Sequence, residues 1–202
     1  MLNEKFLPSS LGLLSRWLST ARRAARFFGS IAWLRELLLA VALAFVIITF
    51  GYQPVKVEGL SMAPALADQE RIFINKFIYR LEPVGRGDVI VFRFPHDPRK
   101  SFIKRVIGLP GETVEIRSGR VYLNGVPLAE DYLVGAARDD SSFLAVTVPA
   151  DHYYVLGDHR STSNDSRTWG TVHRRYIYGK AAFVYWPLDR FGSVPDSGRT
   201  RK

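Results

Sequence analysis

The feature that most constrains this chain is an apolar run that begins after Glu36. Residues 37–50 read LLLAVALAFVIITF, fourteen residues without a charge, and residues 31–50 are interrupted only by the Arg35–Glu36 pair. About twenty residues at 1.5 Å each cross the ~30 Å hydrocarbon core of a bilayer, and an arginine near one end can reach the headgroups. The run therefore predicts one transmembrane helix over residues 31–52.

Two other structures would also use such a run: a buried core helix and a cleaved signal peptide. A signal peptide has its apolar region close to the start and small residues at a cleavage site after it. Here 36 residues precede Leu37, and the sequence GYQPVKV follows Phe50. The pattern favours a retained anchor.

The distribution of charge gives the anchor a direction. The 202 residues have a net charge of +9, and residues 1–36 contribute +4 of it, from six Lys or Arg and two Glu. In the fifteen residues after Phe50, Lys56 is the only basic residue. Under the positive-inside rule the N-terminus is cytoplasmic, and residues from about 53 onward are extracytoplasmic.

The first thirty residues form a basic N-terminal arm with two open interpretations. Between residues 8 and 30, Leu11, Leu14, Leu18 and Ala21 recur near helical spacing with arginines between them. This pattern fits an interfacial amphipathic helix on anionic lipid, and it fits a loosely ordered arm equally well.

After the anchor, short β-branched and aromatic segments alternate with Gly, Pro, Asn and Asp. Ser118-Gly119 and Asn124-Gly125 are dipeptides suited to tight hairpins. This texture predicts a mainly β fold, an antiparallel sheet or barrel-like domain over residues 53–188, with a loose polar tail at 189–202. The candidate strands are Val55–Glu58, Arg71–Asn75, Asp88–Phe94, Ser101–Ile107, Thr113–Ile116, Val121–Leu123, Val146–Val148, Tyr153–Leu156 and Gly179–Trp186.

Composition excludes several kinds of chemistry. The chain has no cysteine, which removes disulfides, thiol nucleophiles and thiolate metal sites. Its four histidines include no H-x-x-x-H spacing, so we expect no metal site and no cofactor. The β region has no clustered basic face with interleaved aromatic residues, so we expect no nucleic-acid partner despite the charge of +9.

Two residues of the β region have the chemistry of a catalytic pair. Ser61 follows the predicted strand at Val55–Glu58, close to a turn. Lys104 alternates with Phe102 and Val106, which places it on an apolar strand face. Desolvation there would lower its pKa, as a general base requires. Either residue alone is weak support, since an isolated serine is usually solvated and a lysine on an edge strand usually aids solubility.

A third segment, GDHRSTSNDSRTWG at residues 157–170, is rich in Ser, Asn, Asp and Arg. If Asp158 and Asp165 are buried they need partners, and Arg105, Arg160 and Arg167 are available for bidentate pairing. The alternative is a surface loop with local turns made by its own Asn and Asp side chains.

Taken together, the segments carry a resemblance that none carries alone. The blocks SMAPAL at 61–66, GDVIVF at 87–92, KRVIGLPGE at 104–112 and GDHRSTSNDSRTWG at 157–170 resemble, in order, those of the bacterial type I signal peptidases, or leader peptidases. The similarity runs from about Val57 to Pro187, and the preceding anchor fits it. The resemblance implies a membrane-anchored serine endopeptidase that removes signal peptides from translocated preproteins.

The resemblance also assigns roles to residues. Ser61 matches the nucleophile, Lys104 the general base, and Ser163 the serine that hydrogen-bonds and orients the lysine amine. Two structural ion pairs near the site are implied, Asp158 with Arg105 and Asp165 with Arg167. The implied substrate-binding residues, which would leave room for alanine and little more, are Val57, Gly59, Met62, Leu66, Phe102 and Ile103.

The same resemblance predicts partners and location. The substrate would add as a strand to residues 54–58 and 101–104, and the partners would be preproteins and the phospholipid membrane, near the translocation machinery. The enzyme would lie in the bacterial inner membrane as a single-pass protein. Two rival interpretations are a self-cleaving repressor relative and a non-catalytic, membrane-anchored β module.

The chain departs from the family pattern at two positions. Some members have a serine two residues before the nucleophile, and its hydroxyl completes the oxyanion hole; here the residue is Gly59. The N–H of Ser61 remains, and the second donor is left to a water or another backbone N–H. At His159 the family usually has asparagine, and we expect altered loop bonding there and no catalytic role.

Overall fold

A computed structural model of the chain describes residues 33–46, 51–133, 135 and 139–196. The chain divides into two compact units, residues 1–49 and residues 50–202. In the first unit, residues 33–46 form an α-helix whose side chains are exposed all round. Over the ranges described, no helix is both long enough and apolar enough to cross a membrane. The predicted arm at 1–30 lies outside the described residues, as do residues 31–32 and 47–50 of the predicted span. The last residue of that span, Tyr52, is instead the first residue of the strand Tyr52–Lys56.

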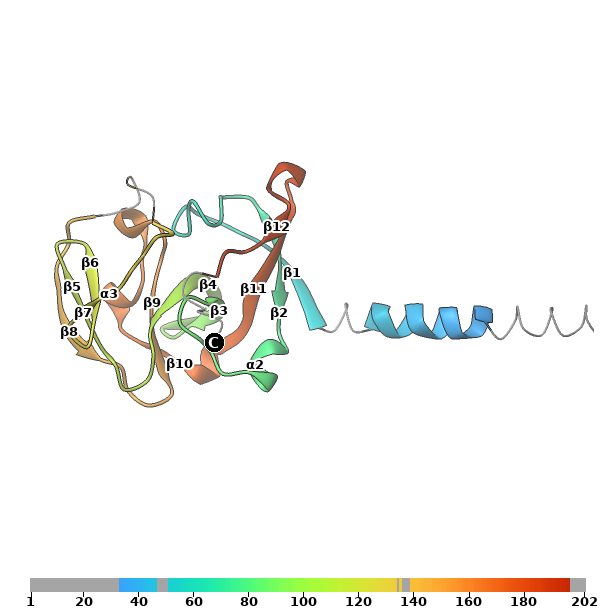
Figure 1. Cartoon of the computed structure of the whole chain (residues 1–202), viewed down its shortest axis with the longest axis horizontal. Helices are drawn as coiled ribbons and strands as arrows, with labels where there is room; N and C mark the ends of the chain where they lie inside the picture. Colours follow the sequence, from blue (N-terminus) through green and yellow to red (C-terminus); the bar gives the residue numbers. More distant parts are fainter. Residues whose placement is uncertain (1–32, 47–50, 134, 136–138, 197–202) are drawn as a thin grey trace, which may run out of the picture. The chain divides into compact units, whose positions relative to one another are not determined.

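The second unit is built on two antiparallel sheets, as the alternating sequence pattern predicts. The larger has eight strands in the order β1-β2-β11-β3-β4-β9-β10, and β12 pairs with β11 (Figure 1). Its strands are β1 Tyr52–Lys56, β2 Arg71–Asn75, β3 Val89–Phe94, β4 Asp97–Gly108, β9 His152–Leu156, β10 Val172–His173, β11 Ile177–Trp186 and β12 Gly192–Ser193.

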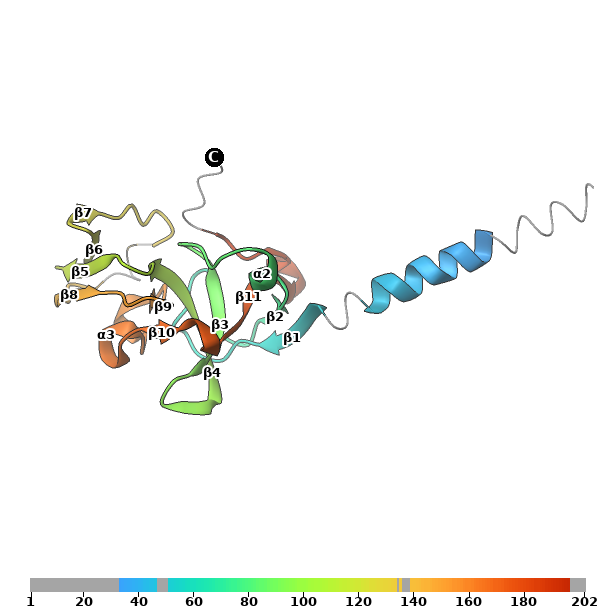
Figure 2. The ribbon, with the colours of Figure 1, turned by 90° about the horizontal axis from the view of Figure 1, so that it is seen from below.

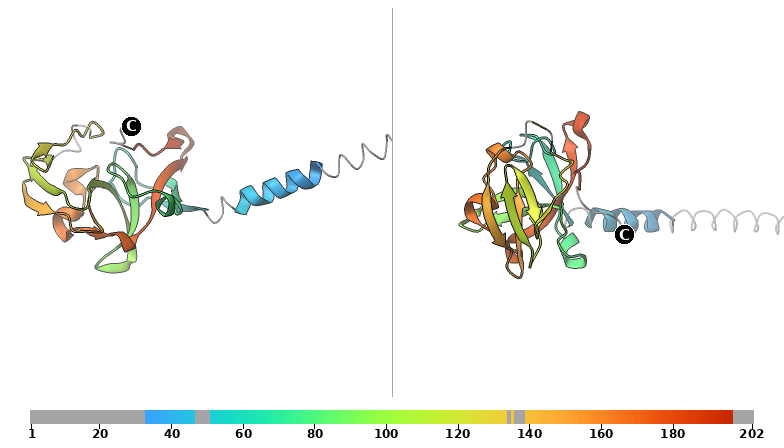
Figure 3. Two further views of the ribbon diagram at one scale, coloured as in Figure 1. Left: turned by 60° about the horizontal axis from the view of Figure 1, so that its bottom comes forward. Right: turned by 60° about the vertical axis from the view of Figure 1, so that its left-hand side comes forward.

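The smaller sheet has four strands in the order β7-β6-β5-β8. Figure 2 shows its strands side by side at the end of the domain next to β9, and Figure 3 shows them from two further directions. Helical structure in this unit consists of single turns between strands. The strands of this sheet are β5 Thr113–Arg117, β6 Arg120–Leu123, β7 Val126–Pro127 and β8 Phe143–Thr147, and the helical turns are α2 Ile78–Leu81, α3 Ser166–Trp169, Arg160–Thr162, Arg174–Tyr176 and Leu188–Arg190.

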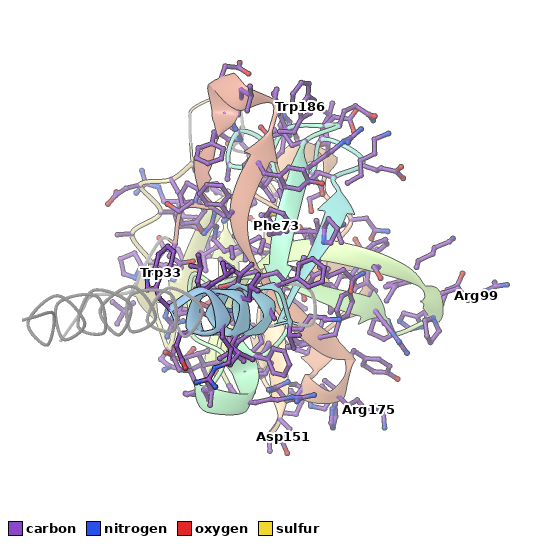
Figure 4. The ribbon with its side chains drawn as sticks, turned by 90° about the vertical axis from the view of Figure 1, so that its right-hand side faces the viewer. Trp33, Phe73, Arg99, Asp151, Arg175 and Trp186 are labelled. Carbon is purple, nitrogen blue, oxygen red and sulfur yellow. The ribbon has the colours of Figure 1, made fainter. Side chains whose placement is uncertain are left out.

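The predicted mainly β fold is confirmed, and each of the nine predicted strands is present, Arg71–Asn75 with the predicted bounds and the other eight with shifted ends. The largest difference is in β4, which begins at Asp97 rather than Ser101 because its hairpin pairing with β3 extends to Asp97 and Phe94. Figure 4 shows Arg99 at the tip of this hairpin. Both predicted dipeptides form hairpin turns with positive φ, at 45° and 72° for Ser118 and Gly119 and at 50° and 81° for Asn124 and Gly125.

The core explains why β3 reads as an unbroken apolar run. Val89 and Val91 pack into one hydrophobic cluster, and Ile90 and Phe92 pack into a second cluster on the opposite face. A strand buried on both faces needs apolar residues at every position rather than at alternate ones. A third cluster joins the smaller sheet to β4 and β9, and its fully buried members are Ile107, Val114, Ile116, Val121, Val148, Tyr154 and Leu156.

The prediction of a loose tail from residue 189 is wrong for residues 189–196. Val194 is only 5% exposed and packs in the first cluster. Arg190 pairs with the buried Glu70 at 2.8 Å, and the carbonyl of Pro195 accepts a hydrogen bond from Arg105 at 2.9 Å. The polar composition of this segment concealed its docking, because Val194 is its only buried residue. Its other contacts are the pairing of β12 with β11 and bonds to Glu70, Arg105 and Lys180, all of which join it to distant parts of the chain.

We predict that ending the chain at Phe191 destabilises the fold. The truncation removes Val194 from the core and deprives buried Arg105 of one acceptor, which together cost about 3 kcal/mol of unfolding free energy. Thermal unfolding in detergent, followed by circular dichroism, should show a melting temperature lower by roughly 6–12 °C. A chain ending at Asp196 is the control and should melt like the full chain. Equal melting of both truncations would show that the segment contributes nothing.

Candidate active site

Ser61 is positioned by the extension of β1 and by a neighbouring loop. Beyond Lys56 the chain stays paired, since Val57 donates to Glu70 at 2.7 Å and accepts from Gln69 at 2.9 Å. Gly59 then turns the backbone with a φ of +92°, and its N–H donates to Asp68 at 2.7 Å. The turn at Gly59 ends the extended segment before Ser61, and these hydrogen bonds fix the position of the backbone that leads to it.

Lys104 lies in the middle of β4, opposite Ile90 of β3. Its side chain is buried, with the residue 4% exposed, as its alternation with Phe102 and Val106 predicts. The Nζ atom is 2.6 Å from the Oγ of Ser61 and 5.6 Å from the centre of the Phe102 ring. Among the described residues, no carboxylate forms an ion pair with it. The serine hydroxyl is therefore the direct polar partner of the lysine.

Burial changes the acidity of this lysine. It lowers the pKa of the Lys104 ammonium from 10.5 to about 8, because the protein interior solvates the charged form poorly. The negative charges of Asp165 and Asp158 oppose this change by favouring the ammonium, and Arg167 adds to it. A lysine with a pKa near 8 has a substantial neutral fraction in mildly alkaline solution, as a proton acceptor must.

Ser61 and Lys104 lie in a cleft of about 600 Å³. Two strand edges that have no pairing partner within the described part of the chain border it. β1 ends the larger sheet, and residues 101–104 of β4 pair with β3 alone, since pairing with β9 starts at Arg105. Two free edges can take up an extended peptide between them by strand addition. The cleft is lined by Val55, Lys56, Val57, Glu58, Gly59, Leu60, Ser61, Met62, Val91, Ser101, Phe102, Ile103, Lys104, Thr162 and Asn164.

The predicted substrate-binding residues fall into two groups. Five of them line the cleft, namely Val57, Gly59, Met62, Phe102 and Ile103. Leu66 does not: it is fully buried in the first hydrophobic cluster, because the turn after Ser61 carries it into the core beneath the strands.

Sequence reasoning missed four lining residues: Leu60, Val91, Thr162 and Asn164. Leu60 directly precedes Ser61, so its place in the chain could have suggested it. The other three reach the cleft only through sheet pairing and loop docking.

Both implied ion pairs are present and deeply buried. Arg105 binds Asp158 through two bonds of 2.6 and 2.8 Å, with both side chains at most 2% exposed. Arg167 binds Asp165 through bonds of 2.8 and 2.9 Å. Arg105 and Lys104 are adjacent on β4, so this pair sits next to the lysine.

The sequence suggested Arg160 as a candidate partner for Asp158 or Asp165, but it pairs with neither. It pairs with Glu130, 30 residues earlier, and both side chains are 2% exposed. Glu130 lies in the connection between β7 and β8, which no sequence motif marks. Only the docking of the smaller sheet brings this carboxylate to the arginine.

The implied hydrogen bond from Ser163 to Lys104 is absent. The hydroxyl of Ser163 is buried and has no hydrogen-bond partner among the described residues. It lies against Gly157, where an added Cβ would come within 2.2 Å of the Ser163 Oγ. The side chain therefore packs on the glycine backbone and leaves the lysine to Ser61.

Two residues of the loop at residues 157–163, His159 and Gly157, contact the backbone carbonyl of Ser61. The His159 N–H donates to the carbonyl of Ser61 at 3.1 Å, and its ring Nδ1 is within 3.0 Å of the Thr162 hydroxyl. A Cβ at Gly157 would come within 2.4 Å of the Ser61 carbonyl oxygen. Only glycine permits this close approach of two backbones. Sequence reasoning did not single out Gly157.

We predict that Gly157→Ala removes most activity without unfolding the protein. The methyl group would push Ser61 away from Lys104, and a displacement of about 1 Å costs roughly a hundredfold in rate. Peptidase assays and circular dichroism measure the two effects. Gly192→Ala is the control, because a Cβ there meets nothing within 4 Å. A Gly157→Ala protein with unchanged kcat would refute the requirement for close approach.

The described residues contain no group of three or more His, Asp or Glu side chains arranged to hold a metal ion. What the geometry does offer is a serine hydroxyl against a buried lysine amine, in a cleft between two free strand edges. This is an arrangement typical of a serine peptidase that binds its substrate in an extended form.

Comparison with known proteins identifies the family. The family model described as "Signal peptidase, peptidase S26" matches residues 30–186. A "Signal peptidase I" of Leptolyngbya laminosa is 42% identical over 77% of this chain and 79% of its own length. "Signal peptidase I P" of Bacillus subtilis subsp. natto is 37% identical over 79% of this chain and 91% of its own. The chain therefore belongs to the signal peptidase family, peptidase S26.

A crystal structure of a signal peptidase I from Enterococcus faecalis V583 is also similar. It is 40% identical in sequence over 49% of this chain and 97% of its own, with a TM-score of 0.44.

Proposed function

We propose that this chain is a membrane-anchored endopeptidase that cleaves signal peptides after small residues, with Ser61 as nucleophile and Lys104 as general base. Membership of the family makes it a serine endopeptidase that acts on preproteins with signal peptides. The observation that carries the residue assignment is the 2.6 Å distance between the Lys104 Nζ and the Ser61 Oγ at the inner end of the cleft.

Acylation begins with Lys104 neutral. The Ser61 hydroxyl then donates its hydrogen bond to the Nζ lone pair, and the proton passes to Nζ as Oγ attacks the carbonyl carbon of the scissile bond. When the tetrahedral intermediate collapses, the ammonium returns this proton to the departing amine. The new N-terminus leaves, and the signal peptide remains as an ester on Ser61.

Deacylation uses the same base. Lys104 is neutral again after the amine leaves, and it takes a proton from a water that attacks the ester carbonyl. The ammonium then protonates Oγ as the ester bond breaks, which regenerates the free hydroxyl and releases the signal peptide. One lysine therefore serves both halves of the reaction.

The negative oxygen of each intermediate needs donors. The N–H of Ser61 donates to no acceptor among the described residues and is available for this role. The N–H of Gly59 is engaged by Asp68 at 2.7 Å, so we exclude it as the second donor. That donor remains a water or a further backbone N–H.

Specificity for small residues follows from what lines the cleft next to the dyad. Val57 and Met62 are 3% and 2% exposed, so their side chains close the space beneath Ser61. A methyl side chain is accommodated there with least displacement. Extended residues of the preprotein add to the free edges at residues 54–58 and 101–104.

The support for a membrane anchor comes from the sequence and from the family. The family is membrane-associated in bacteria. The apolar run at residues 31–50, together with the basic residues before it, supports a single span with residues 1–30 cytoplasmic and the β domain extracytoplasmic. In the inner membrane, next to the translocation machinery, this arrangement holds the site near the signal peptides that it cuts.

We predict that Ser61→Ala and Lys104→Ala each abolish cleavage. The first removes the nucleophile and the second the base, while neither creates a clash. The assay is cleavage of a preprotein in detergent with mass mapping of the products, alongside a melting curve. Lys100→Ala, at the exposed hairpin tip, is the control and should cleave normally. Cleavage by either dyad variant would eliminate the mechanism and would favour another nucleophile; failure of the wild type would favour a non-catalytic module.

We predict that kcat/KM rises about tenfold per pH unit below pH 8 and levels off above it, because Lys104, with a pKa of about 8, must be neutral. Linked unfolding does not explain this rise. A lysine whose pKa is lowered on folding makes a contribution to stability that is constant below pH 8 and increases from there to about 10.5. Rates that are constant from pH 6 to 9 would contradict the role of Lys104.

We predict that protease added outside spheroplasts digests the chain beyond residue 53. The positive flank before the span should keep residues 1–30 inside, where a tag placed at the N-terminus survives. Immunoblots against tags at both ends measure this. Full protection of the β domain in intact spheroplasts would reverse the proposed orientation.

A further inference from the structure

We propose that Glu130 and Arg160 are a positioning pair for the catalytic serine, by which the smaller sheet holds the loop at residues 157–163 in its active conformation. The inference rests on the proposed function, in which Ser61 is the nucleophile. Neither residue lines the cleft.

Each of the three guanidinium nitrogens of Arg160 makes a hydrogen bond. Two of its nitrogens bind the carboxylate of Glu130, and one of them also lies 3.3 Å from the Tyr132 hydroxyl. Its Nε donates to the carbonyl of Gly157 at 3.1 Å. The Tyr132 hydroxyl in turn donates to Glu130 at 2.8 Å. The arginine is therefore a rigid link between Glu130 and the backbone of Gly157.

Gly157 transmits this constraint to the serine. Its Cα lies so close to the Ser61 carbonyl that an added Cβ would be 2.4 Å from that oxygen. Its N–H donates to the buried Asp165 at 3.0 Å, so the residue is held on both of its backbone polar groups. A shift of Gly157 would therefore move Ser61 relative to Lys104.

Several contacts join the smaller sheet and its β7–β8 connection to the elements around Glu130 and Arg160. Glu130 and Tyr132 lie in the connection from β7 to β8, and the Tyr132 ring packs under the Arg105 guanidinium at 4.5 Å. A second bond from the same connection runs from Asp139 to Arg167 at 2.8 Å. Arg167, in α3, also lies 5.6 Å from the Phe143 ring in β8, and Figures 1 and 2 show α3 next to this sheet.

The deep burial of Glu130 and Arg160 indicates that the pair positions the loop at residues 157–163 rather than stabilising the fold. Removing two charges from water costs about as much as their attraction returns, and well-packed apolar pairs often replace such bridges without loss. An arginine chosen for its fork of donors can, in contrast, hold a carboxylate and a carbonyl at fixed angles. An apolar pair could fill the space, but it could not bind the Gly157 carbonyl.

The test replaces both partners, so that no buried charge is left alone. In the Glu130→Met/Arg160→Met double variant of the full chain, we expect kcat for a preprotein to fall at least tenfold. KM should stay within about twofold and the acid limb of the pH profile should stay near 8, because the cleft and Lys104 are intact. A purely structural pair would leave kcat per folded molecule unchanged, and that result would overturn the proposal.

A matched control exists in the same domain. Arg86 binds Glu112 and the carbonyl of Ile107 with the same chemistry, away from the cleft. The Arg86→Met/Glu112→Met variant should keep the wild-type kcat; an equal loss in this control would also overturn the proposal. The wild type and Ser61→Ala, assayed in parallel, report on the proposed function itself, so its failure is recognised separately.

If the double variant does not fold, Arg160→Lys addresses the same question. A lysine keeps the charge opposite Glu130 but lacks the Nε–H that donates to the Gly157 carbonyl and the rigid fork that holds both acceptors at fixed angles. We expect a melting temperature close to that of the wild type and a kcat reduced at least fivefold. A folded Arg160→Lys protein with the wild-type kcat would refute the positioning role.

Discussion

The rest of this site depends on one desolvated ammonium group. Lys104 is placed in the interior with a hydroxyl as its direct partner rather than a carboxylate, which is an unfavourable position for a charge. A carboxylate in contact would stabilise the ammonium and raise its pKa, and the lysine could then no longer accept a proton near neutral pH. Asp158 and Asp165 are instead each paired with an arginine, and their negative charges only partly offset the lowering of the Lys104 pKa that burial causes. The ion pairs around the lysine thus also control its basicity.

The two sheets contribute differently to this arrangement. The larger sheet provides the strand that carries Lys104, the extension that carries Ser61 and the free edges for a substrate. The smaller sheet provides no lining residue of the cleft among the described residues, but the connection from β7 to β8 supplies Glu130 and Asp139 to the arginines of the neighbouring loop. A scaffold of this kind supports the residues of the cleft with a surrounding shell of residues that do not line it.

Much of this could be read from the sequence, for physical reasons. Alternating apolar residues predict β2, and an unbroken apolar run predicts β3. The dipeptides Asn-Gly and Ser-Gly predict the tight turns. The proximity of Ser61 and Lys104 followed from four ordered blocks and from a lysine on an apolar face. Other features left no local signal: the Glu130–Arg160 pair, the packing of Ser163 against Gly157 and the burial of Val194 all arise from contacts between distant segments. Leu66 was misassigned because a turn, rather than strand alternation, determines where it points.

The docked segment at residues 190–196 has a consequence for the order of events during synthesis. Arg105 is in the middle of the chain, yet one of the acceptors for its buried guanidinium is the carbonyl of Pro195. During elongation, this arginine has its full set of acceptors only after residue 195 has emerged and packed beside β11. Assembly of the neighbourhood of Lys104 therefore waits for a segment 90 residues further along the chain, and a nascent chain lacking this segment carries Ser61 and Lys104 without the complete support that they have in the finished fold.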